Sequence, residues 1–107
     1  MTAAPRFDEL IHAPNLLRIC AALAAVTEAE FSVLRESLEV TDPVLSKHLR
    51  VLHEAGYVTL AKPTGRGGRV RTWVALTSTG RRAFEAHVAE LHRLTEVAAP
   101  AGTAPVR

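Results

Sequence analysis

Apolar residues recur at helical spacing over the first part of the chain and predict its helices. The first helix is expected at residues 6–12, where the apolar positions are Phe7, Leu10 and Ile11. The second is expected to begin near Pro14, because proline suits the first turn of a helix. Its apolar face is expected to consist of Leu16, Ile19, Cys20, Leu23 and Val26. Ser32 is expected to cap a third helix that ends near Glu39. The buried side of that helix is expected to hold Val33, Leu34 and Leu38.

The clearest helix signal in the chain covers residues 42–55. Thr41 can cap this helix with its side chain, and the carboxylate of Asp42 suits the positive end of the helix dipole. Pro43 fits the first turn, and Gly56 can take the left-handed conformation that ends many helices. The apolar stripe is Leu45, Leu49 and Leu52. The opposite side holds Pro43, Ser46, Lys47, Arg50 and Glu54.

After the fourth helix the pattern changes from helical to alternating. It predicts two strands at about residues 57–62 and 69–76, joined by a mobile tip that is rich in turn-forming residues. Thr77 is expected to cap a last helix over residues 78–97. The sequence therefore predicts a mainly α fold with a small β-hairpin, which is a winged helix-turn-helix with a long C-terminal helix.

The composition indicates one globular domain. A chain of 107 residues has room for a single domain, expected at residues 6–97 between flexible tails at 1–5 and 98–107. The single cysteine, Cys20, excludes an internal disulfide and a zinc site built from cysteines, and we expect it to pack in the core. No apolar run approaches the roughly 20 residues of a membrane span, and the N-terminus lacks the apolar stretch of a signal peptide. A cytoplasmic location is therefore expected.

The charge is unevenly distributed along the chain. Residues 1–40 hold three basic and six acidic side chains, whereas residues 41–76 hold six basic and two acidic ones. A basic middle segment of this kind is typical of a surface that binds a polyanion, provided that its side chains share one face.

Two segments carry a resemblance to a known group of proteins. Residues 40–58 read Val-Thr-Asp-Pro-Val-Leu-Ser-Lys-His-Leu-Arg-Val-Leu-His-Glu-Ala-Gly-Tyr-Val, and residues 71–81 read Arg-Thr-Trp-Val-Ala-Leu-Thr-Ser-Thr-Gly-Arg. They resemble the recognition helix and the second wing strand of the ArsR- and MarR-like winged-helix transcriptional regulators, and most closely the small single-domain winged-helix DNA-binding group. The resemblance covers about residues 7–97. It implies a dimer that binds double-stranded DNA sequence-specifically, most often as a repressor, under a regulatory signal whose chemistry the sequence leaves open.

Candidate DNA contacts lie on the 42–55 helix and on the hairpin. Lysine, arginine and serine side chains can pair with phosphates and base edges in the major groove. The recognition helix and its start are expected to contribute Thr41, Asp42, Pro43, Ser46, Lys47 and Arg50. The wing is expected to contact the DNA backbone or the minor groove through Lys62, Arg66, Arg69 and Arg71.

The last helix is expected to build a homodimer, because the hairpin and the other helices bury each other and leave it without a partner. Its apolar positions are spaced three and four residues apart, as in an interhelical seam. The interface is expected to hold Phe84, His87, Val88, Leu91, Leu94 and Ala98, together with Phe7, Leu10 and Ile11 of the first helix. The alternative is that the last helix folds back on its own domain.

Other functions find less support in the sequence. The glycine-rich segment lies in a hairpin tip rather than between a strand and a helix, and nothing places Ser, His and Asp around one cleft, so neither enzyme activity nor a cofactor is expected. The histidine pairs 48/53 and 87/92 lack the i, i+4 spacing of metal ligands on a helix, so no metal site is expected within one chain, and a site shared across a dimer stays open. The remaining alternative is a winged helix that binds another protein without DNA, for which apolar or mixed residues would be expected at positions 43, 46, 47 and 50.

Overall fold

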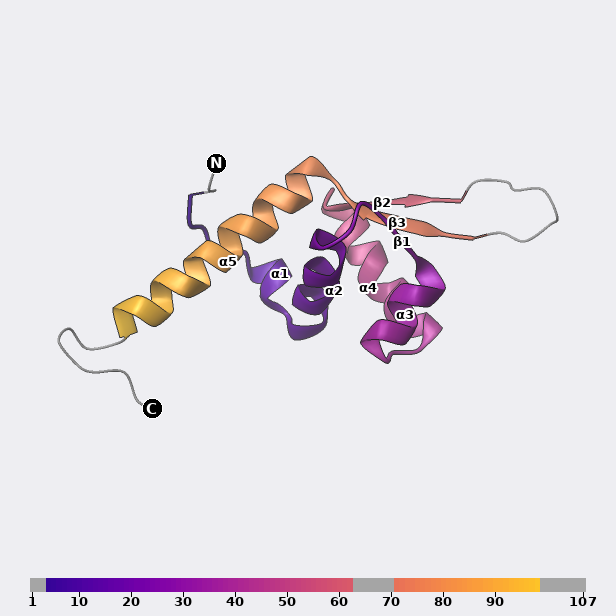
Figure 1. The fold of residues 1–107 in the computed structure, drawn as a ribbon, viewed down its shortest axis with the longest axis horizontal. Coiled ribbons are helices and arrows are strands. Elements are labelled where there is room, and N and C mark those ends of the chain that lie inside the picture. The colour runs from indigo at the N-terminus through magenta and orange to yellow at the C-terminus, as the bar shows by residue number, and fades with distance from the viewer. Residues whose placement is uncertain (1–3, 63–70, 99–107) are drawn as a thin grey trace.

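The computed structural model describes residues 4–62 and 71–98 and shows helices packed around a small antiparallel sheet (Figure 1). The helices are α1 (Glu9–His12), α2 (Pro14–Ala24), α3 (Phe31–Leu38), α4 (Asp42–Glu54) and α5 (Ser78–Ala98). The strands are β1 (Ala29–Glu30), β2 (Val58–Ala61) and β3 (Trp73–Leu76). The predicted fold class is confirmed, including the long last helix of 21 residues. Ala98 belongs to α5 and not to a tail, while residues 1–3 and 99–107 lie outside the described ranges.

In the part of the chain that the structure describes, the sheet has the order β1-β3-β2. The predicted hairpin is present as β2 and β3, with Val58 opposite Leu76 and Ala61 opposite Trp73. The additional strand β1 pairs with β3 on its other side, where Glu30 lies opposite Trp73. The sequence did not predict β1, because a strand of two residues is too short to show an alternating pattern.

Several helix ends follow the predicted capping, and two do not. The Thr41 hydroxyl accepts from the Val44 N–H at 3.4 Å, and the Thr77 hydroxyl accepts from the Gly80 N–H at 2.9 Å. Gly56, with φ 81°, takes the predicted left-handed conformation. The cap assigned to Ser32 was wrong: α3 begins at Phe31, whose N–H donates to the Thr72 carbonyl at 2.8 Å as the chain leaves β1. The first helix begins at Glu9 rather than near residue 6, with its cap at the preceding Asp8.

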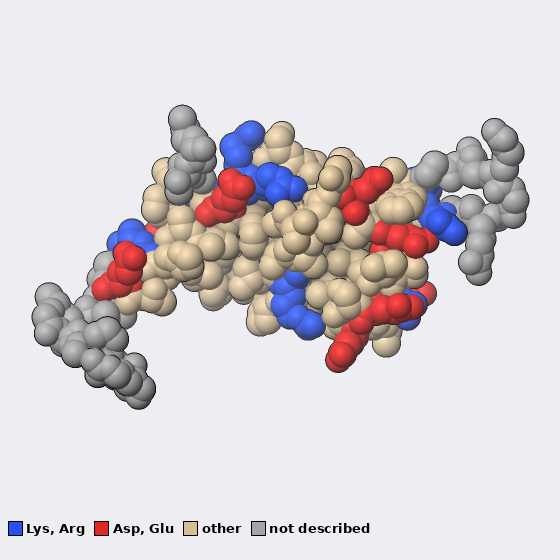
Figure 2. Space-filling model, in the orientation of Figure 1, with Lys and Arg blue, Asp and Glu red and all other residues tan. Residues whose placement is uncertain are grey.

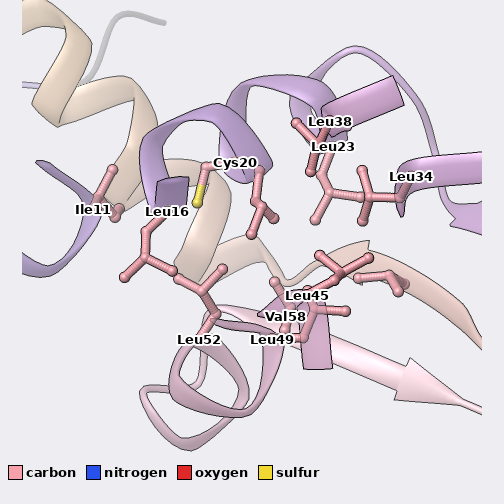
Figure 3. Close-up of a cluster of buried hydrophobic side chains, with 12 residues drawn as sticks. Ile11, Leu16, Cys20, Leu23, Leu34, Leu38, Leu45, Leu49, Leu52 and Val58 are labelled. Carbon is pink, nitrogen blue, oxygen red and sulfur yellow. The ribbon is translucent and has the colours of Figure 1, made fainter. Parts of the chain in front are cut away.

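The hydrophobic core lies between α2, α3, α4 and the sheet. Figure 3 shows its leucine side chains from α2, α3 and α4 pointing toward one another and toward Val58 of β2. The predicted stripe of α4 is buried, and so is Cys20, where burial and the nearby Asp8 carboxylate raise the pKa of the thiol to about 11. Val26 and Val33 were expected to be buried, but they are 43% and 56% exposed. Val26 lies beyond the end of α2, and Val33 lies off the inward stripe of α3 that holds Leu34 and Leu38.

The N-terminal half of α5 packs on its own domain, contrary to the expectation that this helix lacks an intramolecular partner. It contacts α1, α2 and β3. Ile11 and His87 were both expected at a dimer interface, but each is fully buried within the protomer. The C-terminal half of α5 extends away from the other elements, and Leu94 on it is 41% exposed (Figure 1).

Candidate nucleic-acid interface

The polar face of α4 is exposed, as its helical spacing predicted. Because Leu45, Leu49 and Leu52 point into the core, the helix is fixed with its other side toward solvent. The exposed side holds Pro43, Ser46, Lys47 and Arg50. An exposed helix face with two cations and a hydroxyl group has the size and the donors that the major groove of DNA accepts.

The start of α4 is tied to the preceding helix by an ion pair. The Arg35 Nε of α3 lies 2.8 Å from the Asp42 Oδ1. This contact partly neutralises the carboxylate, which would otherwise repel a nearby phosphate. Thr41 is exposed beside it, and its hydroxyl oxygen caps α4.

A groove of about 420 Å³ separates α4 from the sheet. Its α4 wall includes Ser46, Arg50 and His53, and its sheet wall includes Lys62 and Thr72. Its apolar lining is Phe31, Leu49 and Leu60. Asp42 also lines the groove, and its carboxylate is paired with Arg35. Arg50 and Lys62 on the two walls, with the apolar lining between them, suit the charged phosphates and the apolar sugar faces of one nucleic-acid strand.

Two polar residues of this groove, His53 and Thr72, were not among the sequence-predicted contacts. His53 lies three residues after Arg50, so the helical period could have placed both side chains on one side of α4. Thr72 precedes β3, and only the tertiary fold brings it opposite the helix. Both polar side chains line the groove that the predicted contacts Ser46, Arg50 and Lys62 form.

Of the two predicted wing cations that the structure describes, Lys62 and Arg71, one forms an ion pair within the chain. Lys62 is exposed. The Arg71 Nε lies 3.4 Å from the Glu30 Oε2, which the additional strand β1 brings beside it, and the Arg71 side chain remains 57% exposed. An exposed ion pair of this kind is weak, so Arg71 can exchange it for a phosphate at little cost. Arg66 and Arg69 lie outside the described residues.

A separate cluster joins the N-terminal segment to α5. His87 of α5 is fully buried, with its Nδ1 3.0 Å from the Asp8 backbone nitrogen and its Nε2 3.2 Å from the Nδ1 of His12. Desolvation on burial and the nearby His12 lower the pKa of His87 below its ordinary value of 6.5. The buried imidazole is therefore neutral and serves as a hydrogen-bonding group of the fold.

Asp8 links this cluster to the turn after α4. Its carboxylate accepts from the Ile11 N–H at 2.9 Å and from the Tyr57 hydroxyl at 2.6 Å. The hydrogen bond to the carboxylate, together with burial, raises the pKa of Tyr57 to about 12. Tyr57 lies between α4 and β2, so one side chain connects the N-terminal segment with the turn after α4.

The charged side chains do not form one continuous basic patch on the face shown in Figure 2. Basic and acidic groups are interspersed there, and most of the acidic ones in view lie over the half that holds α3 and the sheet.

Among residues 4–62 and 71–98, no group of three or more His, Cys, Asp and Glu side chains is arranged to hold a metal ion. None of the helices in those ranges is both long and apolar enough to cross a membrane.

Comparison with known proteins identifies the family. The family model described as a winged helix DNA-binding domain matches residues 16–95. The chain belongs to this winged helix family. The winged helix protein is 36% identical over 80 residues to the uncharacterized protein MJ0432 of Methanocaldococcus jannaschii, a match that spans 75% of this chain and 86% of that protein.

Solved structures agree with this assignment. A transcriptional regulator homologue from Pyrococcus horikoshii OT3 superimposes with a TM-score of 0.78 at 27% identity, over 84% of this chain and 88% of that one. The zinc-responsive MarR family member ZitR of Lactococcus lactis has the same fold, with a TM-score of 0.54 at 23% identity over 74% of this chain and 53% of that one. The predicted winged helix DNA-binding family is confirmed, and the winged helix protein is a DNA-binding regulator rather than an enzyme. The likeness to the MarR family member ZitR is one of fold.

Proposed function

We propose that this protein is a repressor that binds an inverted-repeat operator in double-stranded DNA as a homodimer. The observation that carries the proposal is the exposed polar face of α4, held outward by the buried stripe Leu45, Leu49 and Leu52. Residues 6–97 then act as one unit, in which the winged helix binds DNA and the end of α5 joins two protomers. Repression is the usual mode of action in the group that the sequence resembles.

In this proposal α4 enters the major groove. Lys47 and Arg50 donate hydrogen bonds to phosphates or guanine edges, and Ser46 directly precedes Lys47 on the same exposed side. Pro43 contributes apolar contact, while Thr41 and Asp42 lie at the start of the helix. On the wing, Lys62, Arg66, Arg69 and Arg71 contact the sugar-phosphate backbone or the minor groove.

The groove between α4 and the sheet receives one strand of the DNA backbone. Because His53 lines this groove together with Arg50 and Lys62, we expect it to donate a hydrogen bond to a phosphate. The substitution His53→Leu removes the imidazole donor at similar size and should weaken binding by about 1 kcal/mol, or about fivefold.

The loss should be similar for operator and random duplexes, because phosphate contacts carry no sequence information. Fluorescence anisotropy with both duplexes provides the measurement. His92→Leu, at an exposed histidine on α5, is the matched control and should bind like the wild type. A His53→Leu protein with full affinity would remove His53 from the interface.

The dimer is supported by the apolar side chains on the projecting half of α5. Leu94 is 41% exposed, and Phe7 beside α5 is 40% exposed. Val88 and Leu91 of the same helix are half-buried. Phe84 of α5, nearer the core, and Leu10 of α1 are half-buried as well. A second copy of this surface would cover the apolar side chains and set two recognition helices about 34 Å apart, one helical turn of DNA.

Leu94→Glu should dissociate the dimer, because it places a charge within the apolar contact between two α5 helices. Sedimentation velocity at micromolar protein should show a monomer for this variant and a species of twice the mass for the wild type. Thr95→Glu adds the same charge at the neighbouring exposed position and is expected to remain dimeric. A wild-type monomer would refute the dimer.

The decisive test of the proposed function is selection of bound fragments from random double-stranded DNA with the purified protein. We expect enrichment of an inverted repeat whose half-sites are about one helical turn apart. Binding without sequence enrichment would contradict an operator-specific repressor. Absence of DNA binding at low salt would favour the alternative, in which the winged helix binds another protein.

A further inference from the structure

Aromatic rings from two distant parts of the chain lie against one another where the N-terminal segment (residues 6–12) crosses α5. The ring centroid of Phe7 is 4.8 Å from that of His12 and 4.8 Å from that of His87, and the two histidine centroids are 5.2 Å apart. The Arg6 N–H donates to the Ala86 carbonyl at 2.9 Å and aligns the segment with the helix. His87 is fully buried, whereas His12 is exposed. The attachment of this segment therefore includes a titratable pair with one member open to solvent.

The hydrogen-bond partners of His87 fix the position of its proton. Its Nδ1 lies 3.0 Å from the backbone nitrogen of Asp8, which can only donate, so Nδ1 carries no proton. A neutral imidazole has one N–H, which must then lie on Nε2. The Nε2 is 3.2 Å from the Nδ1 of His12, so His87 donates and His12 accepts. Both hydrogen bonds exist together only while both rings are neutral.

We propose that His12 and His87 form a clasp that opens when His12 takes up a proton, which releases the N-terminal segment from α5. The neutral His12 ring accepts through Nδ1 and carries its proton on Nε2, so an added proton must enter at Nδ1. Two N–H groups then face each other, and the hydrogen bond between the rings is lost. Of the two rings, that of His12 is exposed to solvent, whereas that of His87 is buried.

Two carboxylates near the rings, those of Asp8 and Glu90, accept hydrogen bonds from other groups and both favour a positive charge on His87. The Asp8 carboxylate accepts from the Ile11 N–H and the Tyr57 hydroxyl. Glu90, one turn further along α5, accepts from Arg93 at 2.7 and 2.8 Å. Neither of these carboxylates has a hydrogen bond to His12, so neither restores the hydrogen bond between the two rings.

The remaining titratable groups near the rings include one more carboxylate, that of Glu9, three residues before His12 on α1. Arg6 on the same segment carries a positive charge, and the thiol of Cys20 on α2 and the hydroxyl of Tyr57 stay protonated at neutral pH. Since the fold keeps His87 neutral while the unfolded chain protonates it freely, the stability that its depressed pKa confers is complete above the ordinary value of 6.5 and declines as the pH falls below it.

Release of the segment also changes the contacts of Tyr57, which follows the recognition helix. Asp8 moves with the segment, and the Tyr57 hydroxyl then loses an acceptor that lies 2.6 Å away. Tyr57 follows α4, and its backbone carbonyl accepts from the Thr77 N–H at 3.0 Å, just before α5. Acid is therefore expected to loosen the junction that sets α4 relative to α5. This consequence for DNA binding rests on the proposed function, whereas the clasp itself does not.

Amide hydrogen exchange of the full chain, followed by NMR, tests the clasp. Between about pH 7.5 and about pH 5.5, the protection of the Asp8 and Ile11 amides should fall about tenfold in the wild type after correction for the intrinsic exchange rate. His12→Asn places a non-titrating amide oxygen where Nδ1 of His12 accepts. In this variant, the protection of the Asp8 and Ile11 amides should therefore change less than about twofold between the two pH values. His92→Asn, at an exposed histidine on α5, is the matched control and should respond like the wild type.

Equal amide protection at both pH values in the wild type would overturn the clasp. A loss of protection in His12→Asn as large as that in the wild type would also overturn it. If His12→Asn does not fold, the ring nitrogen shifts of wild-type His87 decide instead: a proton on Nε2 is expected at neutral pH, and a proton on Nδ1 would overturn the proposal.

The coupling to DNA is tested separately. For a duplex that the protein binds at neutral pH, lowering the pH should weaken DNA binding by the wild type about fivefold more than DNA binding by the His12→Asn variant. An equal response of the two proteins would overturn the coupling, and failure of every variant to bind DNA at any pH would overturn the proposed function, while hydrogen exchange still decides the clasp.

Discussion

Replacing Gly80 with alanine is expected to lower the free energy of unfolding by about 2–4 kcal/mol. A Cβ atom at this position would lie 2.1 Å from the Tyr57 carbonyl oxygen and 2.8 Å from its carbonyl carbon. These atoms belong to backbone that is held by the Thr77 N–H at 3.0 Å, so the clash cannot be relieved by turning a side chain. The first turn of α5 would have to move away from the turn after α4.

Urea denaturation of the wild type and the variant measures this loss. The neighbouring Thr79 is exposed, so Thr79→Ala serves as the control and should change the stability by less than about 0.5 kcal/mol. A loss below about 1 kcal/mol for Gly80→Ala would show that the first turn of α5 can shift at little cost. The close approach gives a physical reason for glycine in the segment Leu-Thr-Ser-Thr-Gly-Arg at residues 76–81.

Lys47→Ala and Arg50→Ala are each expected to weaken operator binding by about 1–3 kcal/mol, or about 5- to 150-fold. Both side chains are exposed on α4, and neither contributes to the core, so the folded state should be retained. The loss arises because each variant leaves a phosphate or a base edge without its charged donor. Anisotropy titrations at fixed salt on the selected operator provide the measurement.

A cation elsewhere on the surface controls for the loss of net charge. Arg82 is exposed on α5, and Arg82→Ala removes one positive charge away from α4. We expect its effect to be several times smaller, because a distant exposed charge is screened by salt. Thermal melting checks that each variant is folded. If both α4 variants melt normally and still bind with full affinity, α4 is not the recognition helix.

The local sequence was sufficient where one element contains its own signals. For α4, the cap at Thr41, the proline in the first turn and Gly56 at the end all act within a few residues, so both ends were predicted within one residue. The leucine stripe at spacings of four and three predicted which side is buried, and therefore which side presents Lys47 and Arg50. The same reasoning correctly placed the Thr77 cap of α5.

The local sequence did not predict contacts between residues that lie far apart in the chain. The strand β1 is too short to have a period of its own, yet it brings Glu30 to Arg71 and changes the charge of the wing. Val33 is apolar and was therefore expected to be buried, but it lies outside the packed stripe of α3. Contacts of this kind depend on how elements pack, which the spacing of residues within one element does not encode.

The sequence by itself determined the winged helix, the exposed basic face of α4 and the helical nature of α5, because periodicity and capping act over a few residues. The tertiary structure alone decided that Ile11 and His87 lie inside the protomer and that His12 completes a histidine pair. Those two histidines are 75 residues apart, and only the packing of the N-terminal segment on α5 brings them within hydrogen-bonding distance. A helical stripe shows which side chains share a face, but the neighbouring elements decide whether that face meets the core, solvent or a second copy.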